Sequence, residues 1–121
     1  NAHSIADREI MQTKTALLEK WRAKEKEGAR YRSFDKDGEL DYSVVQTLFD
    51  AGLIDPACAP KPTFPTRILF PDVPDDEFAG KQQRIDFILV SDPLKTGVIS
   101  YPRDEVLNKI SDHYPVVLEL K

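Results

Sequence analysis

The feature that most constrains the fold is an alternating apolar segment, RIDFILVS, at residues 84–91. Side chains of an extended chain point alternately to opposite faces, so this pattern predicts a β-strand. Asp86 would then share a face with Ile88 and Val90. A carboxylate on an otherwise apolar face is costly to bury without a partner, so Asp86 is expected to have one.

The first half of the chain reads as helical. Apolar residues spaced three or four apart predict one helix over residues 7–27, with Gly28 after its end. A second amphipathic helix is expected after Asp41 or Ser43, either of which can cap it. Gly52 suits the left-handed residue that ends this helix.

The second half of the chain reads as three short strands. Residues 97–101 and 115–120 are predicted strands in addition to residues 84–91. Residues 56–83 carry most of the prolines and predict a long irregular connection with at most a short strand. Three strands form a thin sheet, and one of its apolar faces has no obvious cover within the chain.

Composition limits the class of protein. The 121 residues suffice for one domain with a core, and the 40% hydrophobic and 31% charged fractions are typical of globular chains. A net charge of −4 excludes binding to nucleic acid by bulk charge. Cys58 is the only cysteine, so no internal disulfide forms. No apolar run is long enough for a membrane span, and no signal peptide is visible, so localisation stays unknown.

His113, in the segment SDHYPVV at residues 111–117, is the main candidate for chemistry. Neighbouring residues of an extended segment point apart, so Asp112 is not its hydrogen-bond partner. Asp86 is the natural carboxylate to hold the imidazole tautomer. The alternatives are that His113 is a structural hydrogen-bonding residue and that Asp86 pairs with Arg84 or accepts a turn hydrogen bond.

Four motifs in this order resemble the endonuclease/exonuclease/phosphatase superfamily, whose fold is that of pancreatic deoxyribonuclease. They are DAGLIDP, TFPT, RIDFILVS and the terminal SDHYPVVLEL. The resemblance covers the whole chain. It implies an α/β (α+β) protein in which residues 1–121 are the C-terminal portion of one domain, half of a four-layer αββα sandwich with a mainly antiparallel sheet and flanking helices.

The first residues, NAHS, have two readings within this resemblance. They can be the last Asn of the Gly-Asp-Phe-Asn motif of the family, or its earlier Asn-x-His motif. The order of the motifs favours the first reading, because nothing in residues 25–45 fits Gly-Asp-Phe-Asn. The N-terminal half of the enzyme, with the main metal-binding Glu, is then expected as a second chain, as a cleaved partner or as a part of the enzyme outside this sequence, and this chain alone is expected to be inactive.

The resemblance implies hydrolysis of a phosphodiester or phosphomonoester with Mg²⁺, or Mn²⁺ or Ca²⁺, as the cofactor. His113 and Asp86 would be catalytic, with Asp86 holding the His113 ring. Asn1 would orient the phosphate, and Asn1 and His113 would bind the substrate. Asp112 would lie at the metal site. Ser111 is expected to position the backbone rather than to act as a nucleophile.

Two other functions stay open. The chain could be a non-catalytic binding or interaction module of the same fold, or an unrelated small α+β domain in which His113 and Asp86 are only structural. A separation of these two side chains well beyond hydrogen-bond reach would favour the unrelated domain. The substrate is also open among nucleic acid, a lipid headgroup and a small molecule. The arginines that could contact nucleic acid are Arg30, Arg32, Arg67 and Arg84.

Overall fold

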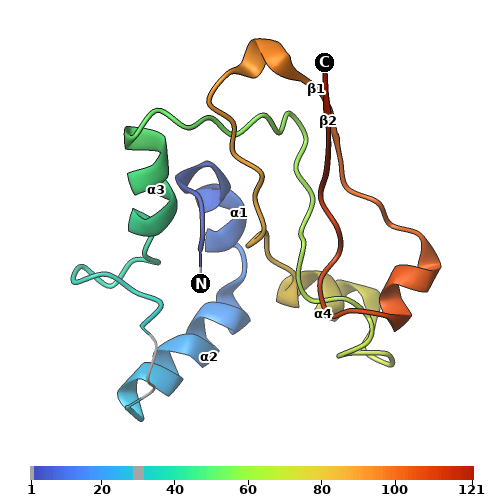
Figure 1. Ribbon diagram of the computed structural model, residues 1–121. Coiled ribbons are helices and arrows are strands. Elements are labelled where there is room, and N and C mark those ends of the chain that lie inside the picture. Colours follow the sequence, from blue (N-terminus) through green and yellow to red (C-terminus); the bar gives the residue numbers. More distant parts are fainter. Residues whose placement is uncertain (1, 29–31) are drawn as a thin grey trace.

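The computed structural model describes residues 2–28 and 32–121 and combines helices with a short antiparallel sheet (Figure 1). The elements in chain order are η1 (Ile5–Asp7), α1 (Arg8–Gln12), α2 (Thr15–Lys26), α3 (Ser43–Asp50), α4 (Asp75–Lys81), η2 (Pro93–Lys95), β1 (Thr96–Ser100), η3 (Glu105–Lys109) and β2 (Val117–Leu120). This mixture agrees with the expected α+β class. Asn1 lies outside the described residues, as does Arg30.

The helix predicted over residues 7–27 is broken into η1, α1 and α2. The break falls at Thr13, whose hydroxyl donates a hydrogen bond to the carbonyl of Ile10 at 2.6 Å. Back-bonding of this kind bends a helix, and here it separates α1 from α2. In the broken arrangement the side chain of Met11 is buried and that of Ile10 is exposed.

The second helix follows the prediction at its C-terminal end, whereas its N-cap residue is Tyr42, without a side-chain cap hydrogen bond, and not Asp41 or Ser43. The Asp41 carboxylate accepts a hydrogen bond from the backbone N–H of Ser43 at 2.8 Å, where α3 begins. Hydrogen bonding to Ser43 lowers the pKa of Asp41, because it stabilises the charged form. After α3, Gly52 has a φ of 98°, the left-handed conformation expected of it.

The connection at residues 56–83 contains a helix that the sequence analysis missed. The carboxylates of Asp75, Asp76 and Glu77, which lie in the segment predicted to be irregular, form the first turn of α4. Negative charge is favourable at a helix N-terminus, which accounts for their position. Phe78 is the buried residue of α4, and the guanidinium of Arg67 lies over its ring.

The prediction of a β-strand over residues 84–91 is wrong, because within the described residues this segment forms no continuous ladder of hydrogen bonds with a neighbouring strand. The segment makes isolated bridges only next to and near its ends, Phe64 with Gln83 and Ile54 with Val90. The amides between these bridges do not pair with a neighbouring strand, and two of them bond to a side chain described below. An alternating pattern favours extended backbone, but a ladder also needs an adjacent strand in register.

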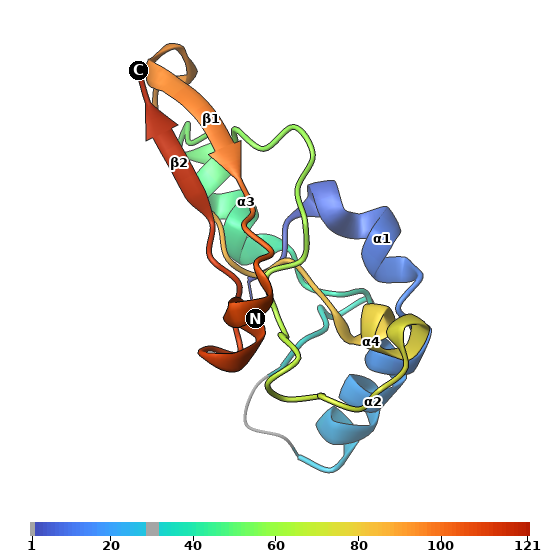
Figure 2. The same cartoon turned by 90° about the vertical axis from the view of Figure 1, so that its right-hand side faces the viewer.

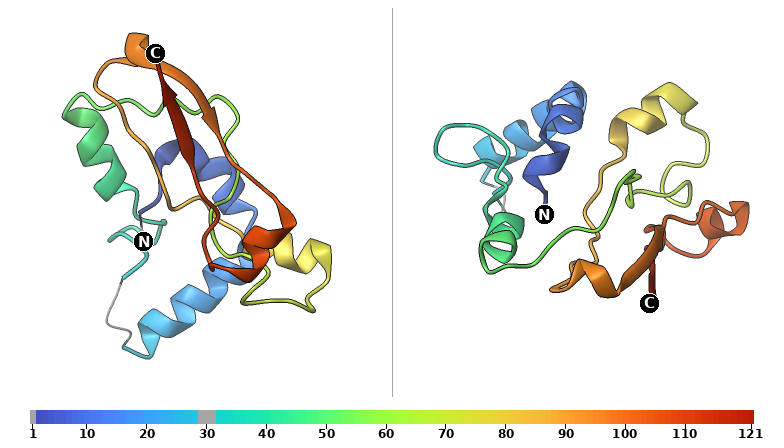
Figure 3. Two further views of the ribbon diagram at one scale, coloured as in Figure 1. Left: turned by 45° about the vertical axis from the view of Figure 1, so that its right-hand side comes forward. Right: turned by 90° about the horizontal axis from the view of Figure 1, so that it is seen from above.

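The other two predicted strands form the sheet. β1 and β2 pair antiparallel, with Thr96 opposite Leu120 and Ser100 opposite Val117, and the register shifts between Thr96 and Ile99. Figures 2 and 3 show this ribbon standing to one side of α1 and α2, with the C-terminus at its far end. A two-stranded ribbon is marginally stable by itself.

The buried core lies among the helices. It consists of Met11, Leu18 and Leu40, with four half-buried side chains packed around it, namely Leu17, Trp21, Phe34 and Tyr42. Trp21 therefore packs against the core, whereas Phe49 and Phe87 are half-buried outside it. Within residues 2–28 and 32–121, no helix has the length and apolar character that a membrane crossing requires.

Candidate functional site

The structure brings the predicted pair of His113 and Asp86 together. Nδ1 of His113 lies 2.7 Å from Oδ2 of Asp86, although 27 residues separate them in the sequence. Both side chains are 40% exposed, so the contact is reachable from solvent. An ionised carboxylate only accepts hydrogen bonds, so Nδ1 of His113 is the donor, and in the neutral ring Nε2 carries the lone pair.

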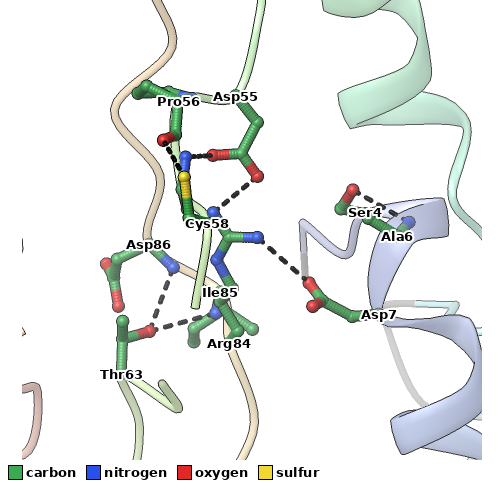
Figure 4. Close-up of polar contacts among 11 residues, drawn as sticks. Ser4, Ala6, Asp7, Asp55, Pro56, Cys58, Thr63, Arg84, Ile85 and Asp86 are labelled. Atoms are coloured by element: carbon green, nitrogen blue, oxygen red, sulfur yellow. Dashed lines mark hydrogen bonds and ion pairs between the residues drawn. The ribbon is translucent and has the colours of Figure 1, made fainter. Parts of the chain in front are cut away.

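Thr63 fixes the backbone that carries Asp86. Its hydroxyl oxygen accepts hydrogen bonds from the N–H groups of Ile85 at 3.0 Å and Asp86 at 3.1 Å (Figure 4). Thr63 is 0% exposed, so water does not replace these bonds. The Thr63 backbone also pairs on both sides, with Gln83 and with Tyr114. One buried residue therefore joins the segments that carry the two members of the pair.

The His113 segment is held by further contacts to its backbone. The hydroxyl oxygen of Ser111 accepts a hydrogen bond from the N–H of His113 at 3.1 Å. Thr66 donates its hydroxyl to the carbonyl of Ser111 and its N–H to the carbonyl of Asp112. Ser111 thus has the backbone-positioning contact expected of it.

Two aromatic side chains border the His113 segment. The ring of Phe64 lies against the imidazole of His113, with 4.9 Å between ring centroids and a tilt of 49°. Tyr114 is buried, lies under the guanidinium of Arg103 and donates its hydroxyl to Asn108. Asn108 also accepts the N–H of Arg67, so it joins η3 to the loop after Thr66. These contacts limit the positions open to the imidazole.

The predicted metal ligand is not part of a ligand cluster in the part of the chain that the structure describes. Asp112 is exposed, and its carbonyl is occupied by Thr66. Across residues 2–28 and 32–121, no group of three or more His, Cys, Asp or Glu side chains is arranged to hold a metal ion. The described residues therefore offer the exposed Asp112 carboxylate but no complete set of Mg²⁺ ligands. Asn1, predicted to orient the phosphate, lies outside them.

Arg84 does not pair with Asp86, which was one alternative for that carboxylate. Its guanidinium lies 2.6 Å from Asp55 and 3.7 Å from Asp7, and it is 5% exposed (Figure 4). Burial raises the pKa of Asp7 more than the nearby guanidinium lowers it. Arg84 therefore connects η1 to the segment after α3. Asp86 pairs with His113 instead of Arg84.

Sequence reasoning missed Thr63 and Phe64 as site residues. Both belong to the TFPT motif, which carried the family resemblance but received no role. Their positions depend on contacts with residues 20 to 50 positions away, which no local pattern displays. The resemblance was therefore the only signal that could have found them.

Comparisons with protein-family models, with curated proteins and with solved structures found no match to this chain. The assignment of roles therefore depends on the residues and contacts described above.

Proposed function

We propose that this chain carries the imidazole–carboxylate pair of a metal-dependent phosphoester hydrolase. The observation that supports the proposal most is the 2.7 Å contact between Nδ1 of His113 and Oδ2 of Asp86 in a half-exposed position. Such a pair suits proton transfer or hydrogen bonding at a phosphate, because the carboxylate fixes the ring and its tautomer while the far nitrogen stays available. The resemblance of DAGLIDP, TFPT, RIDFILVS and SDHYPVVLEL to the endonuclease/exonuclease/phosphatase superfamily is the reason for proposing phosphoester hydrolysis.

In this proposal His113 acts through Nε2. In the neutral ring that nitrogen accepts a proton from an attacking water, and in the protonated ring it donates a hydrogen bond to a phosphate oxygen. Asp86 holds Nδ1–H in both states. The ring of Phe64, tilted against the imidazole, limits the orientations of His113. Thr63 and Ser111 are positioning residues that act through the backbone of Asp86 and His113.

A divalent cation would supply charge stabilisation when bound, since Mg²⁺ neutralises charge that develops on a phosphoryl group. Asp112 would be its ligand from this chain, directly or through water. The remaining ligands would come from an N-terminal half of the same domain, which the resemblance implies. The chemistry assigned to this chain stays with His113 and Asp86.

The same proposal extends to the fold. The chain would form the C-terminal half of a four-layer αββα sandwich, with the β1–β2 ribbon continued and covered by the N-terminal half. Apolar side chains on the ribbon support this arrangement, since Leu120 is 75% exposed and Val98 63% exposed. Exposed apolar side chains grouped on a short ribbon are typical of a surface that is buried in an assembly.

The test compares three preparations in the presence of Mg²⁺ or Mn²⁺. They are this chain alone, this chain mixed with a polypeptide that supplies the proposed N-terminal half, and the mixture with His113→Ala. Hydrolysis of bis(p-nitrophenyl) phosphate and of p-nitrophenyl phosphate is followed at 405 nm. Hydrolysis is expected only in the wild-type mixture, and loss of one charge-stabilising group should lower kcat by about 100- to 1000-fold.

A control is the mixture with His3→Gln, because His3 is the other histidine and its ring bonds the Gln83 side chain and not Asp86. It should retain kcat. Turnover by the chain alone would refute the split site. A wild-type mixture that is inactive but binds phosphate at His113 would favour the non-catalytic binding module.

A further inference from the structure

A second feature of the molecule, separate from the Asp86–His113 pair, is a cleft between two helices. It has a volume of about 600 Å³ and lies between α2, α4 and the segment around residues 64–70. Figures 1 and 2 show α2 and α4 side by side, although about 50 residues separate them. This volume lies within the range of sites that bind small organic ligands.

The floor and walls of the cleft are largely apolar. Leu17 and Trp21 line it from α2, and Phe64 and Phe70 line it from the loop. Residues 17, 21 and 24 lie on one face of a helix because they are three or four positions apart. An apolar surface of this kind gains free energy when it contacts an apolar or aromatic body.

The charge of the cleft differs from that of the chain. Four lysines line it, namely Lys14, Lys20, Lys24 and Lys81, against the two carboxylates of Asp76 and Glu77. The whole chain has a net charge of −4. The lining therefore carries more positive than negative charge although the chain as a whole is acidic, and it favours a negatively charged ligand.

Two of these lysines are already placed against the walls of the cleft. Lys14 donates to the carbonyl of Ala79 in α4, and its burial lowers the pKa of the ammonium group. The ammonium of Lys81 lies 4.9 Å from the centre of the Phe70 ring. Lys20 and Lys24 are exposed and project from the face of α2 that bears Trp21. They are the cations best placed to meet an anionic group.

We propose that this cleft binds a small amphipathic anion, with its apolar body against Trp21, Leu17 and Phe70 and its anionic group at Lys20 and Lys24. The cleft shares Phe64 with the His113 site, but the binding does not depend on hydrolysis at that site. The ligand class follows from the combination of aromatic walls and clustered ammonium groups.

The test uses the fluorescence of Trp21, the only tryptophan of the chain. Octyl phosphate, below its critical micelle concentration and without added metal, serves as the probe. Its binding should shift Trp21 emission to shorter wavelength, because the alkyl chain displaces water from the indole. Octyl glucoside, which lacks the charge, and inorganic phosphate, which lacks the apolar body, should each bind about 10-fold more weakly or worse.

Two variants locate the anionic group. Lys20→Gln combined with Lys24→Gln should weaken octyl phosphate binding by about 2- to 10-fold, as expected for the loss of two exposed ion pairs. The matched control combines Lys26→Gln with Lys109→Gln, which removes the same charge at exposed positions outside the cleft. Equal affinity losses in the two double variants would overturn the proposal.

A third variant tests the apolar body while preserving the fold. Gly80 lines the cleft, and a Cβ added there would meet no atom within 4 Å. Gly80→Leu should favour α4, because glycine is unfavourable inside a helix, and it should fill part of the cleft. Octyl phosphate binding should fall by about 10-fold with the thermal midpoint unchanged or raised. Unchanged binding in this stable variant would overturn the proposal, as would the absence of any Trp21 shift in the wild type.

Discussion

Thr63→Val tests whether one buried hydroxyl holds the candidate site together. The substitution keeps the shape of the side chain and replaces the hydroxyl by a methyl group. Thr63 is 0% exposed, and its oxygen accepts from the N–H groups of Ile85 and Asp86. After the substitution both amides lose their acceptor, and the site offers water no access on that side.

The expected loss follows from these two contacts. A buried donor left without its partner costs about 1–3 kcal/mol, and Ile85 and Asp86 are half-buried, so we take the lower half of that range for each amide. The free energy of unfolding of Thr63→Val should therefore fall by about 2–4 kcal/mol. This is a large part of the 5–15 kcal/mol that is usual for a folded domain.

Equilibrium unfolding in urea measures this free energy, and an unchanged m-value shows that the folded state is as compact as before. Two controls bracket the effect. Thr63→Ser keeps the acceptor and loses one buried methyl group, which should cost about 1 kcal/mol. Thr15→Val makes the same chemical change at an exposed hydroxyl that has no hydrogen bond within the described residues, and it should stay within about 0.5 kcal/mol of the wild type.

The same variant has a readout at the site itself. Asp86 should lose its fixed position in Thr63→Val, so the Nδ1–H signal of His113 should broaden or shift in the ¹⁵N spectrum. It should persist in Thr63→Ser. If Thr63→Val is no less stable than Thr63→Ser, or if it leaves the His113 signal unchanged, the hydroxyl does not position Asp86 and the reasoning fails.

Three further predictions follow from the buried polar groups. Long-range ¹⁵N–¹H spectra near pH 8 should show opposite neutral tautomers for the two histidines. His113 should carry its proton on Nδ1, which faces a carboxylate, and His3 on Nε2, which faces the amide oxygen of Gln83. The same tautomer in both rings would contradict these contacts. Arg84→Met should cost about 3–5 kcal/mol in urea unfolding, because two buried carboxylates lose their cation. Arg8→Met, which breaks only an exposed pair, should cost less than about 1 kcal/mol, and similar losses in both would refute the buried-pair account. Burial lowers the pKa of His3 below 6.5, so the unfolded chain binds the proton more readily than the folded one, and the free energy of unfolding should fall as the pH drops from 6.5 toward the folded-state pKa. His3→Gln should remove this part of the dependence of the unfolding free energy on pH between about pH 5 and 7.5. An equal pH dependence in both proteins would show that His3 does not cause it.

The sequence predicted the local elements better than their assembly. Gly52 acts within a few residues of its own position, so the end of α3 was predictable. The Asp41 carboxylate bonds the N–H of Ser43 next to the start of α3, but the N-cap residue is Tyr42, so the predicted cap was wrong. The break at Thr13 was not, because a threonine hydroxyl competes with the helix only when tertiary packing leaves it the room. α4 was missed because it follows a proline-rich segment that was interpreted as a loop, although its acidic first turn is a signal of a helix start.

The candidate site was predictable where chemistry demanded a partner. A carboxylate on an apolar segment and a histidine that needs a fixed tautomer suggested the contact between Asp86 and His113, and the structure has it. The same reasoning offered Arg84 as an alternative partner of Asp86, and it could not foresee that Asp55 and Asp7 would occupy that guanidinium. By charge alone, Arg84 and His113 are equally good partners for Asp86. The tertiary structure determines which of them contacts it.

The two members of the pair lie on segments with little secondary structure of their own. Asp86 follows a single isolated bridge, and His113 precedes β2 by four residues. Their separation therefore depends on side chain–backbone contacts from Thr63 and Thr66, which connect both segments to one loop. Because that loop also carries Phe64, changes in the loop should move the pair and the wall of the cleft together. Thr63→Val is accordingly expected to weaken octyl phosphate binding at Trp21 and also the Nδ1–H signal of His113. The contacts of Arg84 lie on the other side of residues 84–86. Arg84→Met should therefore lower the free energy of unfolding but leave octyl phosphate binding in the cleft unchanged at temperatures where the chain stays folded.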